Sequence, residues 1–375
     1  MRVLMTTDAV GGVWQYSLAL ARGLTERAGC DVMLVCFGLP REEDLRDALP
    51  SDSVELHTLP LRLEWMPDSE GDVRAALEAV DRLTTLWHAD LVHSNQYCFG
   101  LLGTSVPKLV AAHSDVLGWL AWHRGQPPGS LSGVELDEGI NRYRSLVAAG
   151  LEGATAVVCP SHFMANSLAS AYGCRSLVIH NGLWPNLYGP PRKENAAMMA
   201  GRLWDEAKGA ATAIRAVDGL PLELLLAGPP TGPSGEATLL PPAPNVRHLG
   251  ALSWKDTRRA LARSTFYLAA STYEPFGLAA LEAALSGCVL LASDIPSYRE
   301  IWGDAALYCP CGDPASLRAT LATLLESPDW IATLAQAARD RALERYTADR
   351  MADRYWDLYC SLVADNRLST SPQWL

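Results

Sequence analysis

Short apolar runs alternate along the chain with longer stretches in which apolar residues recur every three or four positions. The run at Asp31–Phe37 is almost continuously apolar, which is typical of strands buried on both faces of a parallel sheet. Gly12–Arg27 and Asp72–His88 have the helical period. Strand-helix alternation of this kind predicts βαβ units with right-handed crossovers. The strands predicted in the first half are Arg2–Thr7, Asp31–Phe37, Val54–Leu59, Asp90–Ser94, Lys108–Ser114, Thr155–Pro160 and Ser176–His180.

A segment rich in Gly, Pro and Asn, Asn181–Asn195, interrupts the alternation and is interpreted as a linker. Beyond it, Thr231–Pro244 predicts a surface loop, and Asp329–Ala364 is strongly helical. The strands predicted in the second half are Ala197–Leu203, Leu222–Ala227, Val246–Leu249, Thr265–Ala270, Val289–Ser293 and Ala306–Cys309. The final helical stretch carries an aromatic stripe that we expect to face a core: Tyr346, Tyr355, Trp356 and Tyr359.

A chain of 375 residues is longer than one hydrophobic core usually supports, which favours two domains. The predicted fold class is therefore α/β, with two Rossmann-like, doubly wound domains facing across a cleft, the first at 1–185 and the second at 186–350. Ligands of open α/β sheets bind outside the carboxyl ends of the strands. The loops after the strands are accordingly where functional side chains are expected.

Charge and composition exclude some classes of partner. The net charge is −11, and residues 1–185 hold 13 basic and 21 acidic residues, leaving 31 − 13 = 18 and 42 − 21 = 21 for the rest. Neither half is basic, which argues against a nucleic-acid partner. No apolar run reaches the roughly 18 residues of a membrane span, so no integral membrane segment is expected. The nine cysteines form no C-x-x-C pair, which favours a reducing cytoplasm.

Polar and glycine residues follow several predicted strands. Gly11 and Gly12 open the first helix, either as a tight turn or as a loop whose amides approach an anion. His113 is either structural or a ligand of sugar hydroxyls. Arg202 and Lys208 share one loop, either as solvated charges or as a clamp for a diphosphate, since a guanidinium fork and an ammonium group both suit phosphate oxygens.

Two glutamates bracket a Pro-Phe-Gly turn and the start of a helix. The plain interpretation is a helix with an acidic first turn. In the functional one, Glu274 is held extended by the proline after it. The amides of Phe276, Gly277 and Leu278, at the start of the helix, could point at phosphate or sugar oxygens. Glu282, about one and a half turns into the helix, could accept both hydroxyls of a ribose, and Gly287 is expected to stop this helix.

These pieces follow one another in the order of a known family. The stretch from Glu274 to Glu282 has the spacing of its E-x7-E motif, which is highly specific. The other matching pieces are Gly11-Gly12, Val158-Cys-Pro-Ser161, Asn181-Gly182, Gly201-Arg-Leu with Lys208-Gly209, Leu226-Ala-Gly-Pro229 and Leu249-Gly250. Over nearly its whole length the chain resembles the retaining glycosyltransferases of the GT-B fold, in the GT4 family of nucleotide-sugar-dependent enzymes.

The resemblance implies roles for the diphosphate contacts. Arg202 and Lys208 would neutralise the diphosphate of the donor, and the amide of Gly12 would also meet it. The family commonly has Glu-Lys-Gly after the Gly-Arg-Leu loop. Here Asp205-Glu-Ala-Lys208 lengthens that spacing by one residue.

The resemblance also implies contacts to the two sugars of the donor. Glu282 would hold the nucleotide ribose. Glu274 would bind the transferred sugar, with the amides from Phe276 to Leu278 beside it. His113 would lie next to the anomeric centre and touch the donor sugar. The residues expected to be catalytic are therefore His113, Arg202, Lys208 and Glu274.

For the whole chain, the resemblance implies transfer of a hexose to an acceptor hydroxyl. Residues 1–185 would bind a carbohydrate or lipid-linked acceptor, residues 186–350 would bind the donor, and a helix at about 351–375 would pack back onto the first domain. The expected donor is a UDP-sugar, with glucose as a guess, in polysaccharide or glycoconjugate biosynthesis. No prosthetic group is expected, and no metal, because the sequence has no D-x-D pair. The expected location is the cytoplasm, with a peripheral position at the inner membrane face as an alternative.

Three other functions fit part of the pattern. A glycoside hydrolase would use Glu274 and Glu282 as acid and nucleophile, but it leaves Arg202 and Lys208 without a purpose. An epimerase of the same fold would change the sugar without an acceptor. A nucleotide-sugar-binding protein would bind the donor without turnover.

Overall fold

The computed structural model of the chain describes residues 1–9, 11–40, 53–127, 129–131, 136–189, 193–232, 235 and 237–370. The chain divides into two compact units, one of Met1–Gly182 with Ala348–Leu375 and the other of Leu183–Thr347. The first unit thus takes its last helix from the end of the chain. The predicted helix at 351–375 begins earlier than expected, at Ala348, and its predicted residues 371–375 lie outside the described part of the chain.

The first unit is built on a parallel sheet with the strand order β3-β2-β1-β4-β5-β6-β7. Because β1 pairs with β2 on one side and with β4 on the other, the strand order reverses between β1 and β4. In such sheets the reversal leaves a crevice at the carboxyl ends, where ligands bind. The strands are β1 (Arg2–Asp8), β2 (Asp31–Phe37), β3 (Val54–Leu59), β4 (Leu91–Ser94), β5 (Lys108–Ala111), β6 (Ala156–Cys159) and β7 (Leu177–Val178).

Apolar residues of the first sheet pack against its helices. Leu4, Val35 and Phe37 form one cluster with Val73 and Val80 of α3. Burial of such side chains contributes about 1.5–3 kcal/mol each. The helices of this unit are α1 (Gly12–Ala28), α3 (Glu70–Leu86), α4 (Val116–His123), α5 (Glu138–Gly153), α6 (His162–Tyr172) and α13 (Ala348–Thr370).

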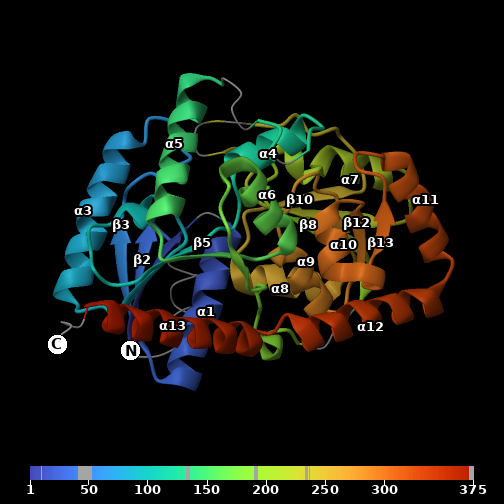
Figure 1. The fold of residues 1–375 in the computed structure, drawn as a ribbon. Helices are drawn as coiled ribbons and strands as arrows, with labels where there is room; N and C mark the ends of the chain where they lie inside the picture. The colour runs from blue at the N-terminus through green and yellow to red at the C-terminus, as the bar shows by residue number, and fades with distance from the viewer. Residues whose placement is uncertain are drawn as a thin grey trace. The chain divides into compact units, whose positions relative to one another are not determined.

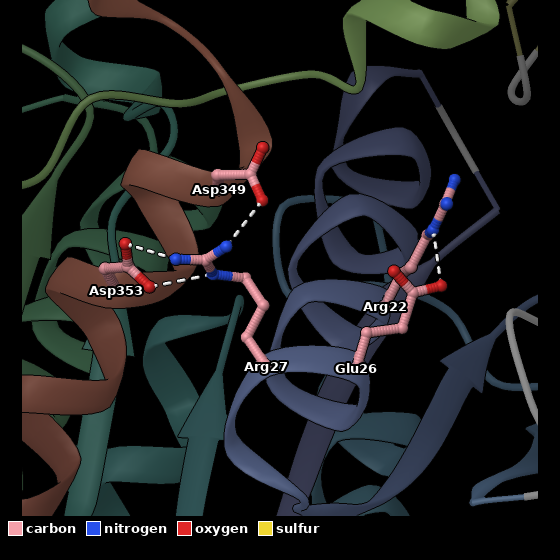
Figure 2. Close-up of polar contacts among 5 residues, drawn as sticks. All are labelled: Arg22, Glu26, Arg27, Asp349 and Asp353. Carbon is pink, nitrogen blue, oxygen red and sulfur yellow. Dashed lines mark hydrogen bonds and ion pairs between the residues drawn. The ribbon is translucent and has the colours of Figure 1, made fainter.

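The C-terminal helix α13 packs against α1 (Figure 1). Tyr355 and Tyr359 of its aromatic stripe are almost fully buried, whereas Trp356 is partly exposed. An ion-pair cluster adds to this contact: Arg27 of α1 makes a bidentate pair with Asp353, with both N–O distances 2.8 Å, and reaches Asp349 at 3.0 Å (Figure 2). Planar guanidinium-carboxylate pairing of this kind is the most favourable form of a surface ion pair.

We expect the Arg27–Asp353 pair to be worth about 0.5–1 kcal/mol, because both side chains stay partly exposed and solvent screens them. Double-mutant cycles in urea unfolding, with Arg27→Ala and Asp353→Ala, measure this coupling. The matched control is Arg22–Glu26, an i,i+4 pair on the same helix drawn beside it in Figure 2, which should give no more than about 0.5 kcal/mol. Equal coupling energies in the two cycles would show that the Arg27–Asp353 pair between two helices stabilises the fold no more than a pair within one helix.

The second unit is a parallel sheet with the order β10-β9-β8-β11-β12-β13, and its strand order reverses between β8 and β11. Its core gathers apolar side chains from the strands and from α7 and α11. The strands are β8 (Glu194–Ala200), β9 (Glu223–Ala227), β10 (Val246–Gly250), β11 (Ser264–Ala269), β12 (Val289–Ser293) and β13 (Leu307–Cys309). The helices are α7 (Ala210–Val217), α8 (Trp254–Arg263), α9 (Leu278–Leu285), α10 (Pro296–Trp302), α11 (Pro314–Leu325) and α12 (Pro328–Arg345).

The predicted α/β class is confirmed, and several predicted boundaries are corrected. The strand predicted at Ala197–Leu203 begins three residues earlier, at Glu194, and stops at Ala200 before Gly201. The strand predicted at Lys108–Ser114 ends at Ala111, which releases His113 from the sheet. Gly287 follows α9 with a φ of 73°, as predicted for a helix stop. Among the described residues, no helix is long and apolar enough to cross a membrane.

Candidate functional site

In the second unit, the loops that carry the predicted cations and Glu274 are neighbours at the strand-order reversal. Arg202 and Lys208 follow β8, and Glu274 follows its neighbour β11. The two loops are joined by the backbone N–H of Thr272, which donates to the carbonyl oxygen of Ala207 at 2.7 Å. Parallel strands end at the same edge of the sheet, so their exit loops are neighbours. This is the position at which open α/β sheets bind ligands.

Lys208 and Glu274 form an ion pair with an N–O distance of 2.7 Å, and their side chains are 16% and 20% exposed. Lys208 ends a short 3-10 turn, Glu206–Lys208, and Gly209 follows it in the left-handed conformation. A Cβ on residue 209 would lie 2.2 Å from the carbonyl oxygen of Ala270, so only glycine allows the two loops to approach this closely. The longer loop that departs from the family spacing therefore still delivers Lys208 to Glu274.

Arg202 lies in the same loop as Lys208, and its guanidinium contacts two residues of that loop. Its Nη2 lies 2.7 Å from a carboxylate oxygen of Asp205, and its guanidinium lies over the ring of Trp204, 5.4 Å from the centroid. Asp205 is only 4% exposed, whereas Arg202 is 36% exposed. Because a guanidinium carries five N–H donors, this arrangement leaves donors of Arg202 for another anion.

The turn after β11 fixes Glu274 relative to α9. Gly277 has a φ of 87° and precedes the first residue of the helix, Leu278. A Cβ at residue 277 would lie 3.3 Å from Cγ of Glu274 and 3.0 Å from the ring of Tyr298. Phe276 is buried and packs edge-on against Tyr346. The backbone that carries the three predicted amides is thus anchored by a buried ring and by a glycine at which a larger residue would be strained by its positive φ and crowded by Tyr298 and Glu274.

Glu282 is 9% exposed and is oriented by two aromatic donors. The hydroxyl of Tyr188 donates to its Oε1 at 3.3 Å, and the indole N–H of Trp254 donates to the same atom at 3.2 Å. Burial raises the pKa of Glu282 to about 7, while the bonds from Trp254 and Tyr188 and the charge of Arg258 oppose the rise. Both donors meet Oε1, so Oε2 is the oxygen placed to accept from a further hydroxyl.

We expect Glu282→Gln to become more stable relative to the wild type as the pH rises. The folded state holds the Glu282 proton more tightly than the unfolded chain, whose pKa is near 4.5. The free energy of unfolding of the wild type therefore falls across pH 4.5–7, by at most about 3 kcal/mol, and this dependence disappears with glutamine. Urea unfolding of both proteins at pH 5 and pH 8 measures it, with the exposed Glu223→Gln as the control. A pH-independent difference between variant and wild type would contradict the burial of this carboxyl.

The first unit carries the other two predicted residues, each after a strand of its sheet. Gly12 is the first residue of α1, preceded by Gly11 with a φ of 84°. His113 follows β5, and its Nε2 lies 2.8 Å from Oδ1 of Asn95. Burial lowers the pKa of His113 to about 4, so the ring is neutral at physiological pH. A neutral ring can exchange hydrogen bonds with a hydroxyl but is a poor proton acceptor.

Family comparisons decide the classification. The model of Glycosyltransferase Family 4 matches residues 10–186, and that of Glycosyl transferases group 1 matches residues 184–341. The chain belongs to the family 4 glycosyltransferases. The two models meet at residues 184–186 and together span both units of this glycosyltransferase.

Relatives of this glycosyltransferase are distant in sequence. It is 24% identical over 417 residues to the alpha-maltose-1-phosphate synthase of Mycolicibacterium smegmatis, covering 97% of this chain and 100% of that protein. It is 32% identical over 130 residues to the glycogen synthase of Mycobacterium tuberculosis, a match that covers 34% of this chain and only 31% of that protein.

Solved structures show the same fold. The sucrose-phosphate synthase of Thermosynechococcus elongatus matches with a TM-score of 0.76 at 19% identity, covering 97% of this chain and 100% of that one. HepE of Anabaena, solved in complex with UDP and glucose, matches with a TM-score of 0.71 at 19% identity, covering 96% and 100%. The fold of this glycosyltransferase is accordingly GT-B, as predicted.

Sequence patterns missed the partners of the predicted residues. Tyr188 lies in the segment interpreted as a linker and Trp254 opens α8, so neither follows the strand that precedes Glu282. Asn95 directly follows β4, and its only signal is a run of polar residues after an apolar strand. In the described part of the chain, no group of three or more His, Cys, Asp or Glu side chains is arranged to hold a metal ion.

Proposed function

We propose that this glycosyltransferase moves a hexose from a nucleoside diphosphate sugar to an acceptor hydroxyl with retention of the anomeric configuration. The observation that carries the proposal is the ion pair of Lys208 with Glu274 at the strand-order reversal of the second unit, with Arg202 on the same loop as Lys208. UDP-glucose is the first donor to test, because HepE was solved with UDP-glucose. The second unit would then bind the donor, and the first would bind a carbohydrate or lipid-linked acceptor in polysaccharide or glycoconjugate biosynthesis.

The ion pair between Lys208 and Glu274 suits a donor that presents a phosphate and a sugar side by side. The ammonium group has three N–H donors, and only one is needed for Glu274 at 2.7 Å. Lys208 can therefore bridge a phosphate oxygen to Glu274, while the carboxylate accepts from sugar hydroxyls. The amides from Phe276 to Leu278 and the free oxygen of Glu282 would complete the contacts to phosphate and ribose.

The reaction needs charge stabilisation more than acid or base catalysis. The bond from the anomeric carbon to the phosphate oxygen breaks, and negative charge grows on the diphosphate, where Arg202 and Lys208 stabilise it. The acceptor oxygen forms the new bond on the same face, and its proton passes to the departing phosphate oxygen. The roles of Gly12 and His113, which lie in the first unit, stay predictions.

The deciding experiment is a thermal-shift panel of UDP, GDP and ADP sugars followed by product analysis. A specific donor at about 100 times its Kd should stabilise the protein by about 2.7 kcal/mol, and Glu282→Ala should remove most of that shift. Transfer to an acceptor then establishes the reaction. A glycoside hydrolysed without nucleotide, a sugar epimerised without acceptor, or binding without turnover would instead support one of the alternative functions.

Transfer is expected to continue in excess EDTA, because the two cations take the place of a metal at the diphosphate. The measurement is the initial rate of transfer with and without EDTA, with added Mg²⁺ or Mn²⁺ in a third series. A loss of activity that either metal restores would overturn metal independence.

A further inference from the structure

The side chain of Asn95 lies at the strand-order reversal of the first unit and has a fixed orientation. Its Nδ2 donates to the backbone carbonyl of Thr6 at 2.6 Å and to the hydroxyl of Ser17 at 3.1 Å. The hydroxyl of Ser17 donates its proton to the carbonyl oxygen of Val13, so its oxygen accepts the hydrogen bond from Asn95. A carbonyl oxygen can only accept, so the NH₂ group of Asn95 must face Thr6 and its Oδ1 must face the opposite way.

Two histidines meet that oxygen. Nε2 of His113 lies 2.8 Å from Oδ1 of Asn95, and Nε2 of His93 lies 3.3 Å from the same atom. An amide oxygen has no proton to give, so Nε2 of His113 must donate to it. Nε2 of His93 lies equally close, 3.3 Å, to the hydroxyl of Tyr16, so its contact with Asn95 does not by itself place the proton of that ring. Burial lowers the pKa of His113 to about 4, so its neutral ring carries a single proton. That proton is therefore on Nε2 of His113, and Nδ1 carries a lone pair.

The C-terminal helix α13 also contacts His93. Nδ1 of His93 lies 2.5 Å from the hydroxyl of Tyr359 on α13. Tyr359 and His93 are both fully buried. Helix α13 thus holds His93 next to Asn95. The hydrogen bond from His113 to Asn95 fixes the orientation of the His113 ring.

We propose that Asn95, backed by His93 and Tyr359, is a positioning residue that fixes His113 in its Nε2–H form and leaves Nδ1 as an acceptor for a hydroxyl of the transferred sugar. The sugar contact rests on the proposed function, whereas the protonation pattern follows from the hydrogen bonds alone. His113 then acts as a fixed acceptor and not as an acid.

The first test reads the rings directly. In the full chain labelled with ¹⁵N-histidine, long-range ¹H–¹⁵N correlations distinguish the two neutral tautomers, and His113→Gln assigns the signal. We expect the Nε2–H tautomer at His113 in the wild type, and a mixture at His113 in Asn95→Ala. Tyr359→Phe should disturb His93, whose Nδ1 loses its hydroxyl partner. The Nδ1–H tautomer at His113 in the wild type would overturn the proposal even if no variant folds.

The second test is kinetic. Asn95→Ala should lower kcat by about tenfold, the scale of one lost hydrogen bond, without changing the affinity for UDP. Wild-type kcat in Asn95→Ala would overturn the positioning role and leave the donor reaction standing. Wild-type protein with the expected tautomers but no transfer from any nucleotide sugar would overturn the proposed function and with it the sugar contact, while the protonation pattern would stand.

Discussion

Arg202→Ala is expected to lower kcat by about 100-fold or more, the cost typical of losing one donor that stabilises charge in the transition state. Arg202 is placed for this role because Asp205 engages one edge of its guanidinium and leaves the other N–H groups for the diphosphate. The effect should fall mainly on kcat, since the charge grows as the diphosphate departs. Steady-state kinetics with saturating acceptor and varied donor measure it.

Two further variants separate this role from a solvated surface charge. Arg202→Lys keeps the charge but loses the fork, so it should recover only part of the rate. Arg247→Ala removes an exposed arginine of the same unit, paired with Glu223 on the neighbouring strand, and should leave kcat unchanged. Equal rates for Arg202→Ala and Arg247→Ala would return Arg202 to the solvated interpretation.

Several strands have the predicted bounds. Asp31–Phe37 and Val289–Ser293 have paired neighbours on each side, and apart from Asp31 all their residues are buried, so their apolar runs match their lengths. The edge strand Val54–Leu59, which pairs on one side, also has its predicted bounds. The strand predicted at Ser176–His180 is only Leu177–Val178, at the other edge of the same sheet, where the local sequence does not show how far the pairing with β6 extends.

A distant contact also divides the helical stretch predicted at 329–364. The N–H of Leu183 donates to the carbonyl of Tyr346 at 3.1 Å, and Leu183 forms an isolated bridge with Thr347. Residues 346 and 347 therefore leave the helical conformation, and α12 and α13 are separate helices. Helical periodicity continues through this point, so only the three-dimensional fold reveals the break.

The candidate site was predictable to the extent that it follows the strand-end rule. Lys208 and Glu274 were identified independently, and the structure joins them because their strands are neighbours. Tyr188 and Trp254 reach Glu282 from other parts of the second unit. Such partners are fixed by packing, and no spacing along the chain indicates them.

Lys208→Met is the second large effect that we expect, with a fall in kcat of about 100-fold or more. Methionine keeps most of the length of the side chain and removes the ammonium group. The variant also leaves Glu274 without the cation that now lies 2.7 Å away, in a site that is largely screened from water. An unpaired carboxylate there costs stability as well as rate, so the single variant alone does not isolate the contact with phosphate.

The double variant Lys208→Met with Glu274→Gln resolves the two contributions. The single variant Glu274→Gln is the reference, because Glu274 itself is expected to contact the transferred sugar. If Lys208 only neutralised Glu274, the double variant should be as fast as Glu274→Gln. If Lys208 stabilises the departing diphosphate, the double variant should regain thermal stability and be about 100-fold or more slower than Glu274→Gln. The exposed Lys255→Met on α8 is the matched control and should keep wild-type kinetics. Equal kcat in the double variant and in Glu274→Gln would assign Lys208 to the support of Glu274 and leave Arg202 as the cation on which departure of the diphosphate depends.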